Sequence, residues 1–419
     1  MDDFLQSLFQ QEYDKEAVCD LTAIFKDIKV MNRTTKSLSI QSIGTFKRTD
    51  ETFQVIKEYL EETKNDKVFI KIGFLASDDN SMYVEMMIYK YLRKLLLDNR
   101  TPNIMRYVMS FHCNDFINTV ERTEEGLYKE KTLKILKKMQ KQYSKLNLDE
   151  AIITLIELGK GMQFNELMGI LSDDDFLSII FQVFYTLREL HLNNIRHNDI
   201  HLANIWINIL PNPKRMIYFV DDNTYAVFDT KYIVKIFDFD KGTFTNDTLT
   251  NFVISTGFCP KYGMCENRDE RFDLLIVLHG LLSSVYASKA MKDFVKKCIR
   301  DPKYLKSDNF RFPGRYCEPL PKEEEEEEEE EEKCSFDHVI EEHAVYNIQQ
   351  LCDSTDVFSF VKHLLTDGFD SADLPVTEEQ PLSSIPLYTF KTNVYISSEC
   401  TYKPIVFANK LLKLQKATS

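Results

Sequence analysis

The sequence predicts an α+β protein, with strands and one prominent helix in residues 37–156 and mainly helices in residues 157–312. Lys67–Ile72 is rich in β-branched and aromatic residues, which is typical of a strand. Ser81–Leu97 places its apolar residues at the spacing of one helix face. Phe176–Leu192 is apolar on almost every side, as expected of a buried helix.

The remaining elements are predicted by the same criteria. Further strands are expected at Ser37–Phe46, Ile104–Phe111 and Ala151–Ile156. Ser172, followed by three aspartates, suits the N-terminal cap of the buried helix, because exposed amides and the helix dipole favour such groups there. Other segments with helical patterns are residues 4–31, 273–286 and 336–365, and the tail over residues 380–419 is mixed.

These elements divide the chain into five parts. The expected parts are an N-terminal helical extension (1–36), a strand-rich lobe (37–156), a helical lobe (157–312), an acidic linker (313–335) and a helical or mixed extension (336–419). The linker contains ten consecutive glutamates, Glu323 to Glu332, which repel one another and have nothing to bury. We interpret it as a solvated tether, with a docking site for a basic partner as the alternative.

Composition excludes several classes of protein. The formal net charge is −14 over 419 residues, and without the glutamate run it is −4, so the sequence lacks the basic balance expected for nucleic-acid binding. No apolar stretch approaches the roughly 20 residues that span a bilayer, and no signal peptide is evident. The nine cysteines show no Cys-x-x-Cys spacing, which favours reduced thiols and a cytoplasmic location.

The segment that carries the chemistry follows the buried helix. It reads His197-Asn-Asp199-Ile-His201-Leu-Ala-Asn204, and a later apolar strand ends in an acid at Lys235-Ile-Phe-Asp238. This pattern resembles the catalytic loop and the Asp-Phe-Gly motif of the protein kinase superfamily. The resemblance implies a bilobal fold with a β-rich N-lobe, a single regulatory helix and an α-helical C-lobe.

The resemblance also implies residue roles. Asp199 would orient or deprotonate the acceptor hydroxyl, with His197 as its structural support. Asn204 and Asp238 would hold Mg²⁺ or Mn²⁺, because hard cations prefer oxygen ligands. Transfer of the γ-phosphate of ATP needs this combination of a carboxylate near the hydroxyl and a metal on the triphosphate.

Other pieces of the family pattern occur in the correct order. Lys71 in Val68-Phe-Ile-Lys71 resembles the lysine that grips the α- and β-phosphates, and Glu85 resembles its glutamate partner. Ile156 corresponds to the gatekeeper, and the backbone of Glu157 to Gly159 would meet the adenine. The resemblance further implies that Asp273 braces the catalytic loop.

Several positions depart from the family. Gly44 is the only candidate for the glycine loop, Phe69 is larger than the usual residue, and Trp206 stands where an aliphatic adenine floor is usual. Asp240 replaces the glycine of Asp-Phe-Gly. Asn198 replaces the arginine that often receives an activation-loop phosphate, so activity is expected not to require that phosphorylation.

His201, in place of the usual lysine, is similar to two groups of relatives. One comprises the aminoglycoside and choline phosphotransferases, and the other haspin-type and large-DNA-virus protein kinases. The excursion over residues 205–235 looks more like the second group, which implies a Ser/Thr kinase of protein substrates in the host cytoplasm or the virion. A small-molecule kinase and a pseudokinase acting as a binding module remain alternatives. A zinc site at His197 and His201 lacks further ligands at matching spacing.

Overall fold

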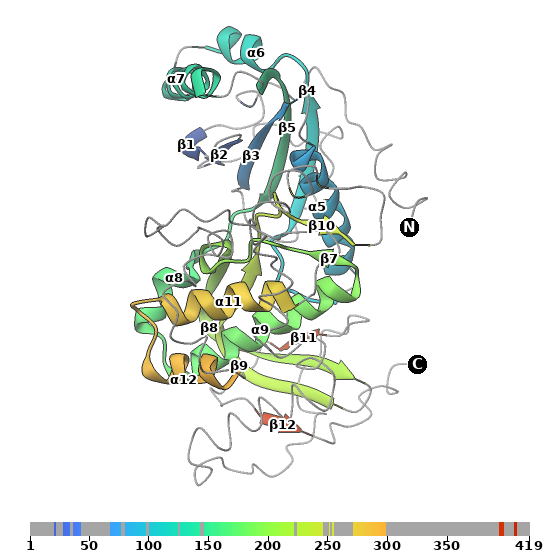
Figure 1. The fold of residues 1–419 in the computed structure, drawn as a ribbon, viewed down its shortest axis with the longest axis vertical. Helices are drawn as coiled ribbons and strands as arrows, with labels where there is room; N and C mark the ends of the chain where they lie inside the picture. The colour runs from blue at the N-terminus through green and yellow to red at the C-terminus, as the bar shows by residue number, and fades with distance from the viewer. Residues whose placement is uncertain are drawn as a thin grey trace, which may run out of the picture.

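The protein has mixed helical and strand content, which confirms the predicted α+β class. One part of the molecule contains strands β1 to β5, and the other contains helices α8, α9, α11 and α12 (Figure 1). The computed structural model describes residues 21, 28–33, 37–42, 68–76, 80–97, 100–124, 126–142, 146–221, 224–245, 251, 254, 271–298, 394–397 and 406–408.

A five-stranded antiparallel sheet forms the first part, in the order β1-β2-β3-β5-β4. Its strands are β1 (Ile28–Arg33), β2 (Ser37–Ser42), β3 (Val68–Ala76), β4 (Tyr107–Cys113) and β5 (Leu146–Glu157). The helical pattern expected up to residue 31 is therefore wrong from Ile28 onward, because this segment pairs with β2 as a strand.

Alternation along β3 gives its two faces different partners. Val68, Ile70 and Ile72 are fully buried in a core shared with helices α6 (Phe116–Arg122) and α7 (Leu127–Gln142). Successive strand side chains point to opposite faces, so Lys71 lies on the side of helix α5.

Helix α5 (Ser81–Leu97) has the predicted bounds. Val84, Met87 and Ile88 on its inner face are fully buried. A Cβ at Gly73 of β3 would lie 1.9 Å from Met82 Sδ, so only glycine permits this close approach of strand and helix. The packing fixes the distance between β3 and the buried Glu85.

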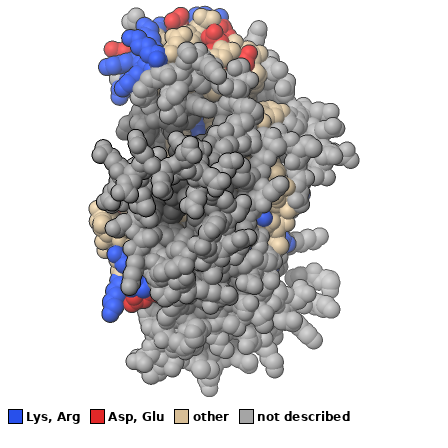
Figure 2. All heavy atoms as spheres, in the orientation of Figure 1, with Lys and Arg blue, Asp and Glu red and all other residues tan. Residues whose placement is uncertain are grey.

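Along the chain, helices α6 and α7 come between β4 and β5. Neither helix is predicted from the sequence. Helix α7 buries only a narrow stripe that includes Leu136 and Met139. Basic side chains gather over α7 in Figure 2, and the exposed lysines there are Lys131, Lys134, Lys137, Lys138 and Lys141. The lysine-rich sequence hides the short apolar stripe on which helix prediction depends.

Helix α9 (Asp173–Leu192) is the central element of the second part. Ser172 caps it as predicted, since its Oγ accepts a hydrogen bond from Asp175 N at 3.2 Å. Helices α11 (Arg271–Ser283) and α12 (Lys289–Cys298) pack against it, and α8 (Phe164–Leu167) with a short 3-10 turn (Met168–Ile170) precedes it.

A long hairpin of β8 (Ile205–Asp221) and β9 (Thr224–Ile236) forms the excursion noted in the sequence. Strand β6 (Gly161–Gln163) pairs with β8. Strands β11 (Val394–Ser397) and β12 (Val406–Ala408) pair with β8 and β9. These two described segments of the C-terminal extension thus complete the sheet of the helical part.

Two further findings concern membrane crossing and the cysteines. No helix within the described ranges combines the length and the apolar character needed to cross a membrane. Cys113, at the end of β4, is disulfide-bonded, so the expectation of reduced thiols is wrong for this residue.

Three of the predicted segments lie outside the described residues. They are residues 4–20, the acidic linker and the helix over residues 336–365.

Candidate active site

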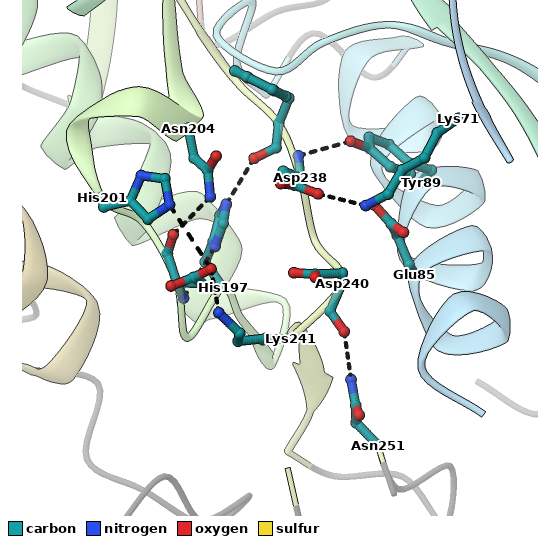
Figure 3. Close-up of polar contacts among 12 residues, drawn as sticks. Lys71, Glu85, Tyr89, His197, His201, Asn204, Asp238, Asp240, Lys241 and Asn251 are labelled. Atoms are coloured by element: carbon teal, nitrogen blue, oxygen red, sulfur yellow. Dashed lines mark hydrogen bonds and ion pairs between the residues drawn. The ribbon is translucent and has the colours of Figure 1, made fainter. Parts of the chain in front are cut away.

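Lys71 joins the strand-rich part to the segment that follows β9. Its Nζ lies 2.8 Å from Glu85 Oε1 of α5 and 2.5 Å from Asp238 Oδ1 (Figure 3). Burial alone would lower the pKa of Lys71. The charges of Asp238 and Glu85 outweigh burial and raise the pKa to well above its ordinary value. Lys71 therefore stays protonated and is shared by two carboxylates.

The two carboxylates have different protonation behaviour. Burial raises the pKa of Glu85 to about 8, although Lys71 opposes that change. Burial alone would also raise the pKa of Asp238, but the charge and hydrogen bond of Lys71 hold it below the ordinary value. Asp238 is thus the acid that remains ionised as the counter-ion of Lys71 at neutral pH.

Asp238 adopts a backbone conformation that side chains usually avoid. Its φ is 68°, in the left-handed region. Its amide donates to Tyr89 Oη of α5 at 2.9 Å, and its carboxylate accepts from Lys71. These two bonds aim the carboxylate into the site and offset the strain of the backbone.

The loop after α9 is fixed by Asp273 of α11. Its carboxylate accepts hydrogen bonds from His197 N at 3.0 Å and Asn198 N at 2.8 Å, and lies 3.0 Å from His191 Nε2. Burial raises the pKa of Asp273, but His191 and His197 lower it more, to about 2. Asp273 therefore takes the bracing position expected from the sequence.

His197 supports the loop from the opposite side. Its ring is fully buried, with Nε2 2.9 Å from Phe237 O and its centroid 4.5 Å from that of Phe239. This contact ties the loop to the residues beside Asp238. The predicted supporting role of His197 agrees with this position.

Asp199 and Asn204 lie together at the centre of the loop. Asn204 Nδ2 donates to Asp199 O at 2.9 Å, which leaves the amide oxygen of Asn204 for another partner. The Asp199 carboxylate lies 2.5 Å from Lys241 Nζ and 3.9 Å from His201 Nε2. Figure 3 shows Asp199's neighbours His201 and Lys241 on the side of the site opposite Lys71.

The segment after Asp238 is held on both sides. Asn198, which has a φ of 61°, donates to Lys241 O at 2.8 Å and to Thr243 Oγ1 at 3.1 Å. Asn251 donates to Asp240 O and Gly242 O, both at 3.0 Å. Strand β10 (Thr243–Phe244) then pairs with β7 (Ile195–Arg196).

The junction between the two parts carries the predicted adenine-binding residues. Ile156 is buried and lies opposite Phe69 in the sheet register. Glu157 N donates to Arg106 O at 2.7 Å, so within residues 157–159 the adenine contact predicted from the sequence would fall to the Glu157 carbonyl and to the backbone that follows it. The Glu157 carboxylate pairs with Lys235 at 3.2 Å.

Polar atoms without partners surround Gly159. A Cβ at this position would lie 2.3 Å from both Trp206 Nε1 and Asn208 Oδ1. Among the described residues, these two atoms are buried and have no hydrogen-bond partner. A buried donor and a buried acceptor left unpaired cost about 1–3 kcal/mol each, and both atoms lie beside the backbone that is predicted to meet the adenine.

Three oxygen-bearing side chains of the site are suitable ligands for a hard cation such as Mg²⁺. The amide oxygen of Asn204 and the carboxylate of Asp238 are oxygen ligands, and Asp240 adds a buried Oδ1 that has no hydrogen-bond partner among the described residues. Nowhere in the described ranges do three His, Cys, Asp or Glu side chains converge as a metal site. Mg²⁺ commonly takes one or two carboxylates and completes its shell with substrate phosphates and water.

Gly44, a residue predicted to belong to the site, lies outside the described residues. Tyr89 and Lys241 contact predicted site residues but were not predicted. Lys241 follows Asp238 by three positions, and its nearness to this predicted acid is a signal in the sequence that points to it.

The comparisons with known proteins give no family. No protein-family model matches the sequence, and no curated protein matches it. The class that fold and site define is therefore an α+β protein with a buried lysine–carboxylate cluster between its two parts.

Proposed function

We propose that this protein is a Mg²⁺- and ATP-dependent kinase with a bilobal protein-kinase-like fold, and that it phosphorylates Ser or Thr hydroxyls of protein substrates. The observation that carries the proposal is Lys71, which contacts Glu85 on the next helix and Asp238, a residue 167 positions away in the chain. This arrangement holds an ammonium group at a fixed position, as binding of the phosphates of ATP requires.

The remaining residues have consistent roles in this proposal. Asn204 and Asp238 would hold Mg²⁺ or Mn²⁺, which supplies neutralisation of the triphosphate charge when bound. Asp199 accepts the proton of the acceptor hydroxyl, and Asp273 with His197 keeps the Asp199 loop in place. Trp206 and Asn208 offer polar atoms to the base beside Gly159.

Protein rather than small-molecule substrates are proposed from the resemblance at residues 205–235. The paired strands β8 and β9 occupy this excursion, and its likeness in sequence to haspin-type and viral protein kinases supports the proposal. The Ser or Thr hydroxyl of a protein is inferred as the acceptor from the sequence resemblance alone.

The test is transfer of labelled γ-phosphate from ATP with Mg²⁺ or Mn²⁺ to generic basic and acidic proteins. The proposal predicts labelled phosphoserine or phosphothreonine. Labelling of an aminoglycoside or choline instead would favour the small-molecule alternative. An absence of both transfer and ATP binding would favour a binding module.

A further inference from the structure

Lys241 makes the shortest ion pair with the proposed catalytic carboxylate. Its Nζ lies 2.5 Å from Asp199 Oδ2, and the two side chains are 20% and 9% exposed. Burial lowers the pKa of Lys241, but the charges of Asp199 and Asp240 raise it more, above the ordinary value. Lys241 is thus a fixed, mostly buried cation.

The backbone around Lys241 is held independently of this ion pair. Asn198 donates to Lys241 O, and Asn251 donates to the carbonyls of the two neighbouring residues. The amide of Gly242 donates to Phe239 O at 2.9 Å and closes a tight turn. A lysine anchored in this way presents its ammonium group at a set position, unlike a surface lysine.

The two lysines serve opposite sides of the site. Lys71 is already shared by Glu85 and Asp238 on the α5 side, whereas Lys241 faces the Asp199 loop (Figure 3). His201 is a poor substitute for Lys241, because burial lowers its pKa despite the nearby charge of Asp199. A transferring phosphoryl group beside Asp199 would therefore meet one permanent cation there.

We propose that Lys241 is a catalytic residue that binds the γ-phosphoryl group during transfer. This inference rests on the proposed function. In the step, the acceptor oxygen forms a bond to the γ-phosphorus, and the bond from that phosphorus to the β–γ bridging oxygen breaks. ADP leaves with the electron pair, and the hydroxyl proton passes to Asp199. Lys241 exchanges no proton; it stabilises the charge on the equatorial oxygens.

The same ion pair compensates the negative charge of Asp199 before the nucleotide binds. Without nucleotide, Lys241 neutralises the buried carboxylate, which would otherwise be costly. A γ-phosphate bound beside Asp199 would meet the ammonium group at this set position, next to the carboxylate that accepts the hydroxyl proton.

The test compares Lys241→Ala and Lys241→Arg with the wild-type chain, measuring kcat and the affinities for ADP and a non-hydrolysable ATP analogue. We expect kcat to fall on the order of 10²- to 10³-fold in the alanine variant. Affinity for the analogue should fall about tenfold while affinity for ADP changes less than about twofold, because only the analogue carries a γ-phosphate. Arginine should retain part of both.

Two further variants keep the test decisive. Lys296→Ala on α12 removes an exposed lysine and should leave every parameter unchanged. His201→Lys in the Lys241→Ala background should recover part of kcat, because it returns an ammonium group to the edge of Asp199. If Lys241→Ala does not fold, Lys241→Gln serves in its place and the same outcomes apply.

Several results would overturn the inference. An unchanged kcat would exclude a catalytic role, and equal losses of ADP and analogue affinity would indicate a purely structural one. If the wild type transfers no phosphate, the proposed function fails, and equal affinities of the wild type and Lys241→Ala for the analogue would overturn the Lys241 assignment as well.

Discussion

Lys71 Nζ of β3 lies 2.5 Å from Asp238 Oδ1, and these residues are 167 positions apart in the chain. Strand β3 belongs to the five-stranded sheet, whereas Asp238 follows a strand of the hairpin sheet. This contact therefore joins the two parts of the molecule at the proposed ATP site.

Asp238→Asn is expected to weaken Mg²⁺–ATP binding by at least tenfold, because an amide supplies less charge to both the metal and Lys71. Calorimetric titration of Mg²⁺–ATP measures this loss. Asp293→Asn, on the surface of α12, is the matched control and should bind as the wild type does. Equal affinities of Asp238→Asn and the wild type would exclude Asp238 as a metal ligand.

Trp206 is the only tryptophan in the chain and provides an intrinsic probe of the proposed base site. Because its Nε1 is buried beside Gly159 without a hydrogen-bond partner among the described residues, ATP binding should change the intensity or wavelength of its fluorescence. Trp206→Phe should remove the signal. Gly159→Ala should reduce ATP affinity, since its Cβ would displace the indole. Saturating ATP that leaves the emission unchanged would argue against a base site at Trp206.

Asp273 should make the protein sensitive to acid. Its pKa in the folded protein is about 2, below the ordinary 3.8, so its ionised form stabilises the fold above about pH 4. That contribution, on the order of 2 kcal/mol, is lost as the pH falls through 2. Urea unfolding should show Asp273→Asn less stable than the wild type at pH 7. The difference should shrink as the pH falls from 4 toward 2, and a difference that is constant with pH would contradict this account.

Gln182 of α9 organises buried polar groups beneath the hairpin. Its Oε1 accepts from Asn103 Nδ2 at 2.8 Å and Val234 N at 3.0 Å, and its Nε2 donates to Tyr232 O at 2.9 Å. Gln182→Leu removes these three hydrogen bonds from the buried interior and should lower the free energy of unfolding by roughly 3 kcal/mol. Gln140→Leu, on the exposed face of α7, should change it by less than about 0.5 kcal/mol, and similar losses in both would contradict the role of Gln182.

The sequence predicted the strongly periodic elements and the order of the site residues. Helix α5 and the cap at Ser172 follow from apolar spacing and local hydrogen bonding, which depend on few neighbours. Helix α7 is not evident in the sequence because it carries many exposed lysines and buries few residues, and the β1 segment has a helical pattern because its pairing with β2 is a tertiary effect.

In the site too, residues that belong to sequence motifs could be predicted, whereas contacts between separate loops could not. Motif order was enough to nominate Lys71, Glu85 and Asp238, which the structure brings together. The ion pair between Lys241 and Asp199 depends on how two loops face each other, and no spacing within either loop encodes it. The hydrogen bond that engages the Glu157 amide likewise depends on Arg106, which lies in another segment.

The measurement that tests the central claim most directly is transfer of labelled phosphate from ATP by the wild type and by Asp199→Asn. The account predicts that the wild type labels Ser or Thr, and that the variant loses transfer by on the order of 10²- to 10⁴-fold with Mg²⁺–ATP affinity within about twofold. The exchange removes the base and its ion pair with Lys241, whereas the Asp199 backbone still accepts from Asn204. Transfer by Asp199→Asn at the wild-type rate would contradict the account.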